Sequence, residues 1–148
     1  MHNLRWGNIP IPQGHVFILV AGIVLHIWLP LMLFESSWLK HVVGWPVFLL
    51  GILLTGWAVT TIQNMDISRP TKIIVSGPYA FGRNPMYVAW TAIYIGIAIL
   101  FNIGWPILLL PVLIAFTHYF VVRCEEQQLE QHFGETYRQY CRDVRRYL

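Results

Sequence analysis

The stretch RNPMYVAWTAIYIGIAILFNIGWPILLLPVLIAFTHYFVVRCEE, residues 83–126, decides the fold of this chain. It predicts two apolar helices, Met86 to Asn102 and Trp105 to Val122, joined by a turn at residues 102–104. At about 1.5 Å per residue, each helix covers roughly the depth of a bilayer core of about 30 Å. An antiparallel hairpin returns its two ends to one membrane face. The polar clusters at residues 83–87 and 123–126 are therefore predicted to be neighbours at the membrane surface.

Composition independently indicates a membrane protein. Hydrophobic residues make up 56% of the 148 residues and charged residues only 11%, a balance that soluble domains of this size rarely have. We expect an all-α fold: one membrane domain covering residues 1–148, with four transmembrane helices and a cytoplasmic C-terminal helical tail. The expected spans are residues 15–34, 45–63, 86–102 and 105–122.

The distribution of basic residues predicts the orientation, because cytoplasmic loops retain Lys and Arg. With four spans, only Lys40 falls on the outer side. The other side carries Arg5, Arg69, Lys72, Arg83, Arg123, Arg138, Arg142, Arg145 and Arg146. This bias places both termini, the loop of residues 64–85 and the tail of residues 123–148 in the cytoplasm, and the protein in the cytoplasmic (inner) membrane. The net charge of +3 therefore requires no nucleic-acid partner, although the basic tail can also touch anionic lipid headgroups.

Helix signals frame the two polar clusters. Asn84 is suited to an N-cap and Pro85 to the first helical position, whereas prolines and glycines make residues 64–85 a structured loop over the cytoplasmic mouth. The fourth helix is expected to continue past the membrane to about His132, with Gly134 as its stop. Glu125 and Glu126 lie on this continuation, opposite the helix start at Asn84.

The predicted site has two chemical poles. The carboxylates of Glu125 and Glu126 suit an ammonium group or ribose hydroxyls, while the helix N-terminus and Arg83 suit a carboxylate or phosphate. S-adenosylmethionine carries such groups, but so do other ligands, and the pattern alone does not choose among them.

The stretch Ser76-Gly77-Pro78-Tyr79-Ala80-Phe81-Gly82-Arg83-Asn84-Pro85-Met86-Tyr87, followed by Glu125-Glu126-x-x-Leu129-x-x-x-Phe133-Gly134-x-x-Tyr137-x-x-Tyr140, resembles the isoprenylcysteine carboxyl methyltransferase and phospholipid methyltransferase superfamily. The resemblance covers the chain from about Thr71 to its end. Asn84 departs from the isoprenylcysteine branch, where His is usual, and Asn-Pro-Met-Tyr is similar to the phosphatidylethanolamine branch. The tail is more similar to bacterial and archaeal isoprenylcysteine-type members, so the methyl acceptor stays open.

The resemblance implies an integral membrane methyltransferase that binds S-adenosylmethionine at the cytoplasmic face. It implies catalytic roles for Arg83 and Glu126, with Arg83 on the acceptor or the methionine carboxylate. The implied cofactor-binding residues are Tyr79, Asn84, Pro85, Tyr87, Glu125 and Glu126. The acceptor is expected to be a lipidic or hydrophobic carboxylate, amine or thiol.

Other interpretations stay open beside this one. His15, His26 and His118 could serve a membrane haem protein, although histidines hydrogen-bonded within a bundle are commoner. A small transporter needs an ionisable group inside the bilayer, and Glu35 lies at the outer end of its span. A nicotinamide-dependent membrane reductase and a non-catalytic membrane subunit are the remaining alternatives. No close-spaced metal-ligand motif occurs in the sequence, and the two cysteines, on the reducing side, are not expected to form a disulfide.

Overall fold

The computed structural model of the protein describes residues 12–62 and 70–147, in which helices are the regular structure and no strand occurs. Arg5, Arg69 and Gln63, which the sequence analysis placed at the cytoplasmic side, lie outside the described residues. The elements are α1 (Gln13–Trp28), α2 (Ser37–Ile62), the 3-10 turn η2 (Gly77–Ala80), α3 (Pro85–Leu100), α4 (Gly104–Phe116), the π-helical η3 (Thr117–Val122), α5 (Arg123–Phe133) and α6 (Glu135–Asp143).

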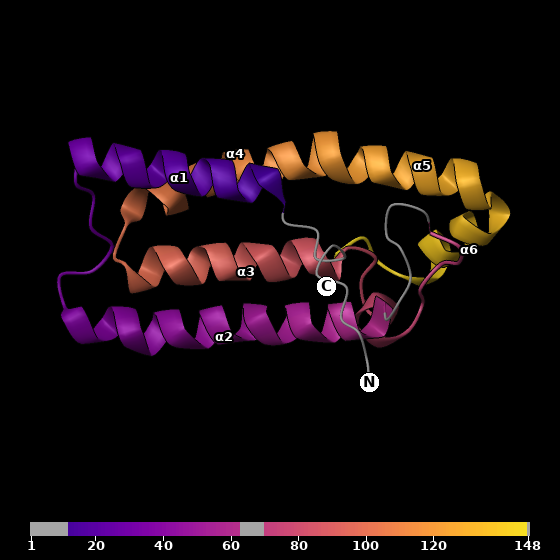
Figure 1. Cartoon of the computed structure of the whole chain (residues 1–148), viewed down its shortest axis with the longest axis horizontal. Coiled ribbons are helices and arrows are strands. Elements are labelled where there is room, and N and C mark those ends of the chain that lie inside the picture. The colour runs from indigo at the N-terminus through magenta and orange to yellow at the C-terminus, as the bar shows by residue number, and fades with distance from the viewer. Residues whose placement is uncertain (1–11, 63–69, 148) are drawn as a thin grey trace.

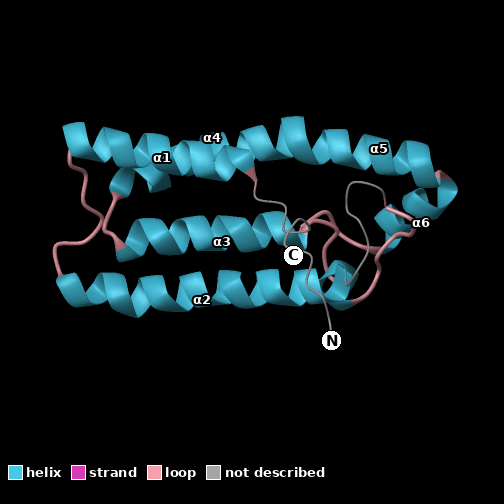
Figure 2. Cartoon of the chain, viewed as in Figure 1, coloured by secondary structure: helices cyan, strands magenta, loops and turns pink. Residues whose placement is uncertain are grey.

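Four long helices lie side by side along the longest axis of the molecule (Figure 1). α1 packs mainly against α4, and α2 packs mainly against α3. α4, η3 and α5 form one continuous helix, Gly104–Phe133, of 30 residues. Figure 2 shows that α5 extends beyond the ends of the other helices and that α6 then folds back toward the bundle. The predicted continuation of the fourth helix is therefore confirmed, and so is its stop, because Gly134 follows at a φ of 54°.

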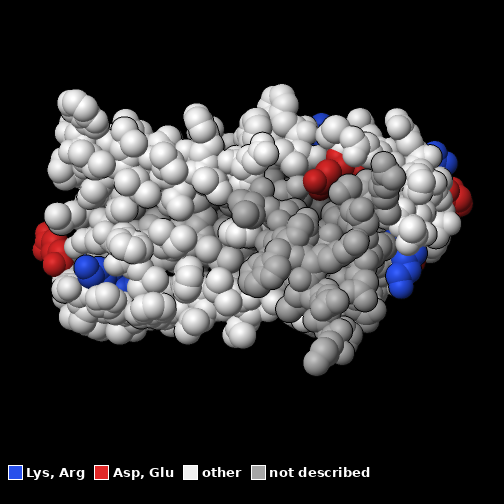
Figure 3. Space-filling model, viewed as in Figure 1, with Lys and Arg blue, Asp and Glu red and all other residues white. Residues whose placement is uncertain are grey.

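Two helices are long and apolar enough to cross a membrane, Ser37–Ile62 and Gly104–Phe133. Only 17% of the most apolar window of each is buried inside the protein, whereas the core helix of a soluble protein would be mostly buried. α1 and α3 are shorter apolar helices of 16 residues each. Large apolar side chains such as Phe17, Trp28, Leu53 and Phe120 are exposed. On the face in Figure 3, the charged side chains form one group at the left end and another spread over the right-hand part, and the described surface between the two groups is uncharged. This surface suits a lipid environment.

The boundaries of the first two apolar helices differ from the expected spans. α1 ends at Trp28 and not near Phe34, because the residue before Pro30 is disfavoured in a helical conformation. α2 begins at Ser37 and contains Pro46 inside it. Trp45 and Pro46 therefore do not open this helix. In an apolar environment each lost backbone hydrogen bond is costly, so a helix that continues through one proline satisfies more of its polar groups than an interrupted one.

Glycines bring α2 and α3 into close contact. A Cβ atom built on Gly96 would lie 2.7 Å from the Cα atom of Phe48, and one on Gly51 would lie 2.8 Å from the carbonyl oxygen of Ala89. Both of these neighbouring atoms belong to the backbone, so they cannot move aside as the end of a flexible side chain could. Small residues that allow two backbones to approach are typical of helix packing in membranes, where dispersion contacts replace the hydrophobic effect between helices.

The turn predicted at residues 102–104 is confirmed and fixes one end of the bundle. Asn102 has a φ of 59°, a left-handed conformation that Asn tolerates. Its Oδ1 accepts hydrogen bonds from the backbone N–H groups of Leu33 and Phe34 at 3.0 and 2.9 Å. The N–H of Gly104 donates to the carbonyl of Leu31 at 2.7 Å. The hairpin turn is therefore tied to the segment that joins α1 to α2.

The glycine contacts generate a matched prediction within α2. Gly51→Ala should lower the free energy of unfolding by about 1–3 kcal/mol, because the added methyl group meets the α3 backbone. Gly56 has no atom within 4 Å of a built Cβ, so Gly56→Ala should be neutral or stabilising by about 0.5–1 kcal/mol. Thermal unfolding in detergent, followed by circular dichroism, measures both. Equal melting temperatures for the two variants would contradict the close approach.

Candidate functional site

The site is built where α3 begins. Asn84 is the N-cap of α3 and Pro85 its first residue, as the sequence predicted. The Asn84 side chain does not cap the helix, however. Its Nδ2 donates to the carbonyl of Arg146 at 3.1 Å, and its backbone N–H donates to the same oxygen at 3.1 Å. Asn84 therefore attaches the C-terminal segment to the start of α3.

A cluster of charges lies beside this junction. The Glu126 carboxylate accepts two hydrogen bonds from Arg146, from Nε at 3.0 Å and from Nη2 at 2.9 Å. Nη2 of Arg83 lies 3.4 Å from Oε1 of Glu126. The Arg83 and Glu126 side chains are only 10% and 14% exposed, and the hydrogen bond to Glu126 raises the pKa of Arg146. A two-pronged Arg–carboxylate pair with restricted access to water is much stronger than an ordinary surface ion pair.

Arg83 also contacts the tail directly. Its backbone N–H donates to the carbonyl of Arg145 at 2.8 Å, and Gly82 forms a parallel bridge with Arg145. Its Nη1 donates to the Sγ atom of Cys141. Its Nε is buried and has no hydrogen-bond partner among the described residues. Arg83 therefore joins the loop to the tail, and within the described part of the chain its buried Nε donor is left without a partner.

Glu125 precedes Glu126 on the same helix, and its side chain contacts α3. The hydroxyl group of Tyr87 donates to Oε1 of Glu125 at 2.7 Å. Surrounding protein atoms raise the pKa of the Glu125 carboxyl by desolvation, although the residue is exposed overall, and the Tyr87 hydrogen bond acts in the opposite direction. The two polar clusters predicted to be neighbours are thus in direct contact at both glutamates.

Tyrosines from the loop and the tail complete this end. The hydroxyl group of Tyr140 donates to the backbone carbonyl of Tyr79 at 2.7 Å. Burial raises the pKa of Tyr140 to about 12 and raises that of Tyr79 as well, with further contributions from neighbouring acidic groups. Both side chains are therefore neutral at physiological pH and offer aromatic surface together with a hydroxyl group.

A cavity of about 1200 Å³ opens between these groups and the bundle. It exceeds the roughly 300–1,000 Å³ of an ordinary small-molecule pocket. Every residue that the sequence nominated for the site lines it: Tyr79, Arg83, Asn84, Pro85, Tyr87, Glu125 and Glu126. Apolar side chains of α1 and α4, among them Phe17, Ile18, Val112 and Phe116, line it as well. The cavity thus combines a charged region with an apolar region.

Several residues of this site were not predicted from the sequence. Arg146 was assigned only to topology and to lipid headgroups, yet it pairs with Glu126. Tyr137 and Tyr140 belong to the recognised tail pattern and line the cavity. His15 and Trp90 also line it. For His15, the available sequence signal was a polar residue within an otherwise apolar helix.

The helix that carries the glutamates widens just before them. Residues 117–122 form the π-helical η3, and Thr117 and Val121 of this segment line the cavity. His118 shares a hydrogen bond of 2.9 Å between its Nδ1 and the hydroxyl group of Tyr147. π-helical turns are often found at functional sites because they re-aim the side chains that follow. Here the turn sets the directions of Glu125 and Glu126.

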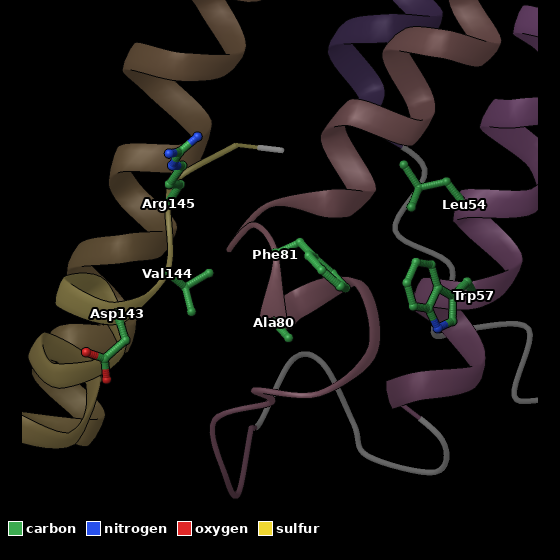
Figure 4. Close-up of a pocket in the computed structure, with 7 residues that line it drawn as sticks. All are labelled: Leu54, Trp57, Ala80, Phe81, Asp143, Val144 and Arg145. Carbon is green, nitrogen blue, oxygen red and sulfur yellow. The ribbon is translucent and has the colours of Figure 1, made fainter.

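A second cavity of about 670 Å³ lies outside the bundle, between the end of α2 and the tail. The rings of Phe81 and Trp57 lie beside each other at its wall, with their centroids 6.2 Å apart, whereas in Figure 4 the Asp143 side chain points away. The Asp143 carboxylate accepts hydrogen bonds from Gln139. This groove therefore lacks converging polar groups, and the large cavity is the candidate site.

Among the residues that the structure describes, no group of three or more His, Cys, Asp or Glu side chains could hold a metal ion.

Comparison with known proteins identifies the family. A model of the phospholipid methyltransferase (PEMT) family matches residues 39–136. The chain belongs to the phospholipid methyltransferase family. Searches of curated proteins and of solved structures found no significant match. The matched range includes α2, α3 and the continuous helix with both glutamates, so it covers most of the candidate site. Family membership supports a methyltransferase role and association with a membrane, as the sequence patterns predicted.

Docking of the tail can be tested through the two cysteines. Arg146→Ala removes both hydrogen bonds to Glu126 and should increase the rate of maleimide labelling of Cys141 several-fold, because the tail no longer holds to the helix ends. Cys124 is already exposed, so its rate is the internal reference. Arg142→Ala, which removes an exposed pair with Glu135, is the control and should leave both rates unchanged. Equal Cys141 rates in the two variants would show that Glu126 does not retain the tail.

Proposed function

We propose that this chain is an integral membrane methyltransferase that uses S-adenosylmethionine and transfers its methyl group to a lipidic or hydrophobic acceptor. The observation that carries the proposal is the convergence, in one cavity, of all seven residues nominated from the sequence. Family membership supports the reaction class. The proposal also includes a single four-span domain, the cytoplasmic inner membrane and cytoplasmic termini. The separation of the charged side chains in Figure 3 into two groups with an uncharged surface between them supports this arrangement.

The donors and acceptors around the cavity fit the cofactor. The unused Nε of Arg83 is a buried donor, and an anionic group such as a carboxylate would satisfy it. Glu125 offers its carboxylate to an ammonium group or ribose hydroxyls. Because Glu126 is already held by Arg146 and Arg83, we assign it to orienting Arg83 and assign Glu125 to direct contact. Tyr79 and Tyr87 supply aromatic faces near a positive sulfonium, a contact worth of order 1 kcal/mol.

The bound cofactor would supply an electrophilic methyl group on a positively charged sulfur. The protein contributes by alignment and by exclusion of water, and no covalent intermediate is needed. Arg83 holds an anionic group in register, and Tyr87 fixes the Glu125 carboxylate through its 2.7 Å hydrogen bond. Asn84 and Pro85 set the position of the helix start from which Tyr87 projects.

The apolar region of the cavity suits the acceptor. Side chains of α1 and α4 line this region, and both helices carry exposed apolar side chains on their outer surfaces. The cavity volume of about 1200 Å³ leaves room for a second molecule beside a nucleotide. We propose that a hydrophobic acceptor enters sideways from the bilayer while the soluble cofactor enters from the cytoplasm.

Cofactor binding is the first test of the proposal. Calorimetry on the detergent-purified protein should detect saturable binding of S-adenosylmethionine, and Glu125→Gln should weaken it by about tenfold or more, because a charge-assisted hydrogen bond is lost. Glu130→Gln is the matched control on the same helix, since Glu130 pairs with the exposed Arg138, and should bind like the wild type. No binding by folded wild type, with or without lipid extract, would overturn the proposed function.

Sideways entry predicts a dependence on hydrocarbon length. Among acceptors with one head group, kcat/KM should rise with each added methylene, because each buried CH₂ contributes about 0.8 kcal/mol until the apolar region is filled. Transfer of a radiolabelled methyl group to homologues of increasing length in mixed micelles measures this. Equal rates on short and long homologues would contradict entry from the bilayer.

A further inference from the structure

The described part of the chain contains three buried side-chain polar atoms without a hydrogen-bond partner: Nδ1 of His15, Nε of Arg83 and Nε1 of Trp90. All three belong to residues that line the large cavity. An unpaired buried polar atom destabilises the protein, and a ligand group that hydrogen-bonds to it removes this cost. Their concentration at one cavity indicates which hydrogen-bonding groups its ligands carry.

The hydrogen bonds of His15 define its protonation pattern. Its Nε2 lies 3.0 Å from Oγ1 of Thr91. The Thr91 hydroxyl group donates its single hydrogen to the backbone carbonyl of Tyr87 at 2.8 Å, so it accepts from His15. Nε2 therefore carries the proton, and Nδ1 presents a bare lone pair. Unlike Arg83 and Trp90, which offer donors, His15 requires a donor from its ligand.

The position of His15 separates it from the charged region. It is the third residue of α1, only 4% exposed, and it contacts α3 at Thr91, one helical turn beyond Tyr87. Phe17 and Ile18 follow it on α1 and line the apolar region. His15 thus lies where the charged region of the cavity meets the apolar region, the place at which a hydrophobic acceptor would present its head group.

We infer that His15 is a catalytic residue that accepts, at Nδ1, the proton of the methyl acceptor, and that the acceptor is therefore a proton-bearing nucleophile such as an amine, hydroxyl or thiol. This inference rests on the proposed function. A carboxylate acceptor could satisfy the donors of Arg83 and Trp90 but would leave Nδ1 unpaired.

The lone pair of the acceptor atom forms a bond to the methyl carbon while the carbon–sulfur bond breaks, and its electron pair stays on sulfur, which becomes a neutral thioether. The hydrogen of the acceptor atom passes as a proton to Nδ1, giving an imidazolium that releases the proton to solvent. A general base of this kind contributes about 10²–10⁴-fold to rate.

Two variants separate proton transfer from structure. His15→Gln keeps a hydrogen-bonding group near the Nε2 position and so retains the contact to Thr91, whereas His15→Asn keeps one near the Nδ1 position but cannot take up a proton at neutral pH. Both should lower kcat by about 10²-fold or more while S-adenosylmethionine binding, measured by calorimetry, stays within about twofold of wild type. His26→Gln is the matched control on α1, where His26 accepts the N–H of Leu31, and should keep wild-type turnover.

The probes are hexadecylamine, hexadecanol, hexadecanethiol and hexadecanoate, which differ only in the head group. In protein with ¹⁵N-labelled histidine, the Nδ1 resonance of His15, assigned through His15→Gln, should shift when an uncharged proton-bearing probe binds and not when hexadecanoate binds. Methylation of hexadecanoate alone would overturn the inference and leave the proposed function standing. A wild-type kcat in His15→Gln would also overturn the inference. So would a His15→Gln variant that loses S-adenosylmethionine binding, because its lower turnover would then come from the lost cofactor. No cofactor binding by the wild type would overturn the proposed function and this inference together.

Discussion

The pairing of Glu126 with Arg146 and Arg83 is the interaction on which the site depends. These three residues come from the fourth long helix, the C-terminal tail and the loop before α3, so one carboxylate joins three segments that are distant in sequence. Glu126 and Arg83 are largely withdrawn from water, where removal of one partner leaves a costly unpaired charge. The backbone bonds from Arg83 and Asn84 to the tail reinforce the same junction. Together with the hydrogen bonds from Tyr140 to Tyr79 and between His118 and Tyr147, these contacts hold the tail over the cavity.

The helices below this junction obey a different constraint. Their outward surfaces are apolar and exposed, so contact between helices has to come from close packing. Glycines provide it between α2 and α3. α1 packs chiefly against α4 and contacts α3 much less. The cavity lies between the α1–α4 pair and the α2–α3 pair, at the end of the bundle where the loop and the tail meet. The space for ligands is thus a consequence of how the helices pair.

Much of the architecture followed from local sequence patterns. The hairpin from Pro85 to Phe133, its turn at Asn102 and its stop at Gly134 were all predicted, because apolar runs, a helix-starting Pro and a terminating Gly act within a few residues. Local rules misplaced the start of α2, where Pro46 lies inside the helix. The span expected from residue 45 began too late, because a helix in an apolar environment keeps its backbone hydrogen bonds by continuing through a single proline.

The sequence by itself determined that the chain is an apolar helical protein, that residues 83–87 and 123–126 meet, and which residues line the cavity from these clusters. Only the tertiary structure decided the roles within the cluster. Arg146 closes on Glu126, which leaves Glu125 to meet Tyr87, and His15 reaches across from α1 to Thr91. Helix periodicity places side chains on a face, whereas ion pairs and unpaired buried atoms depend on the distances between segments that no local pattern encodes.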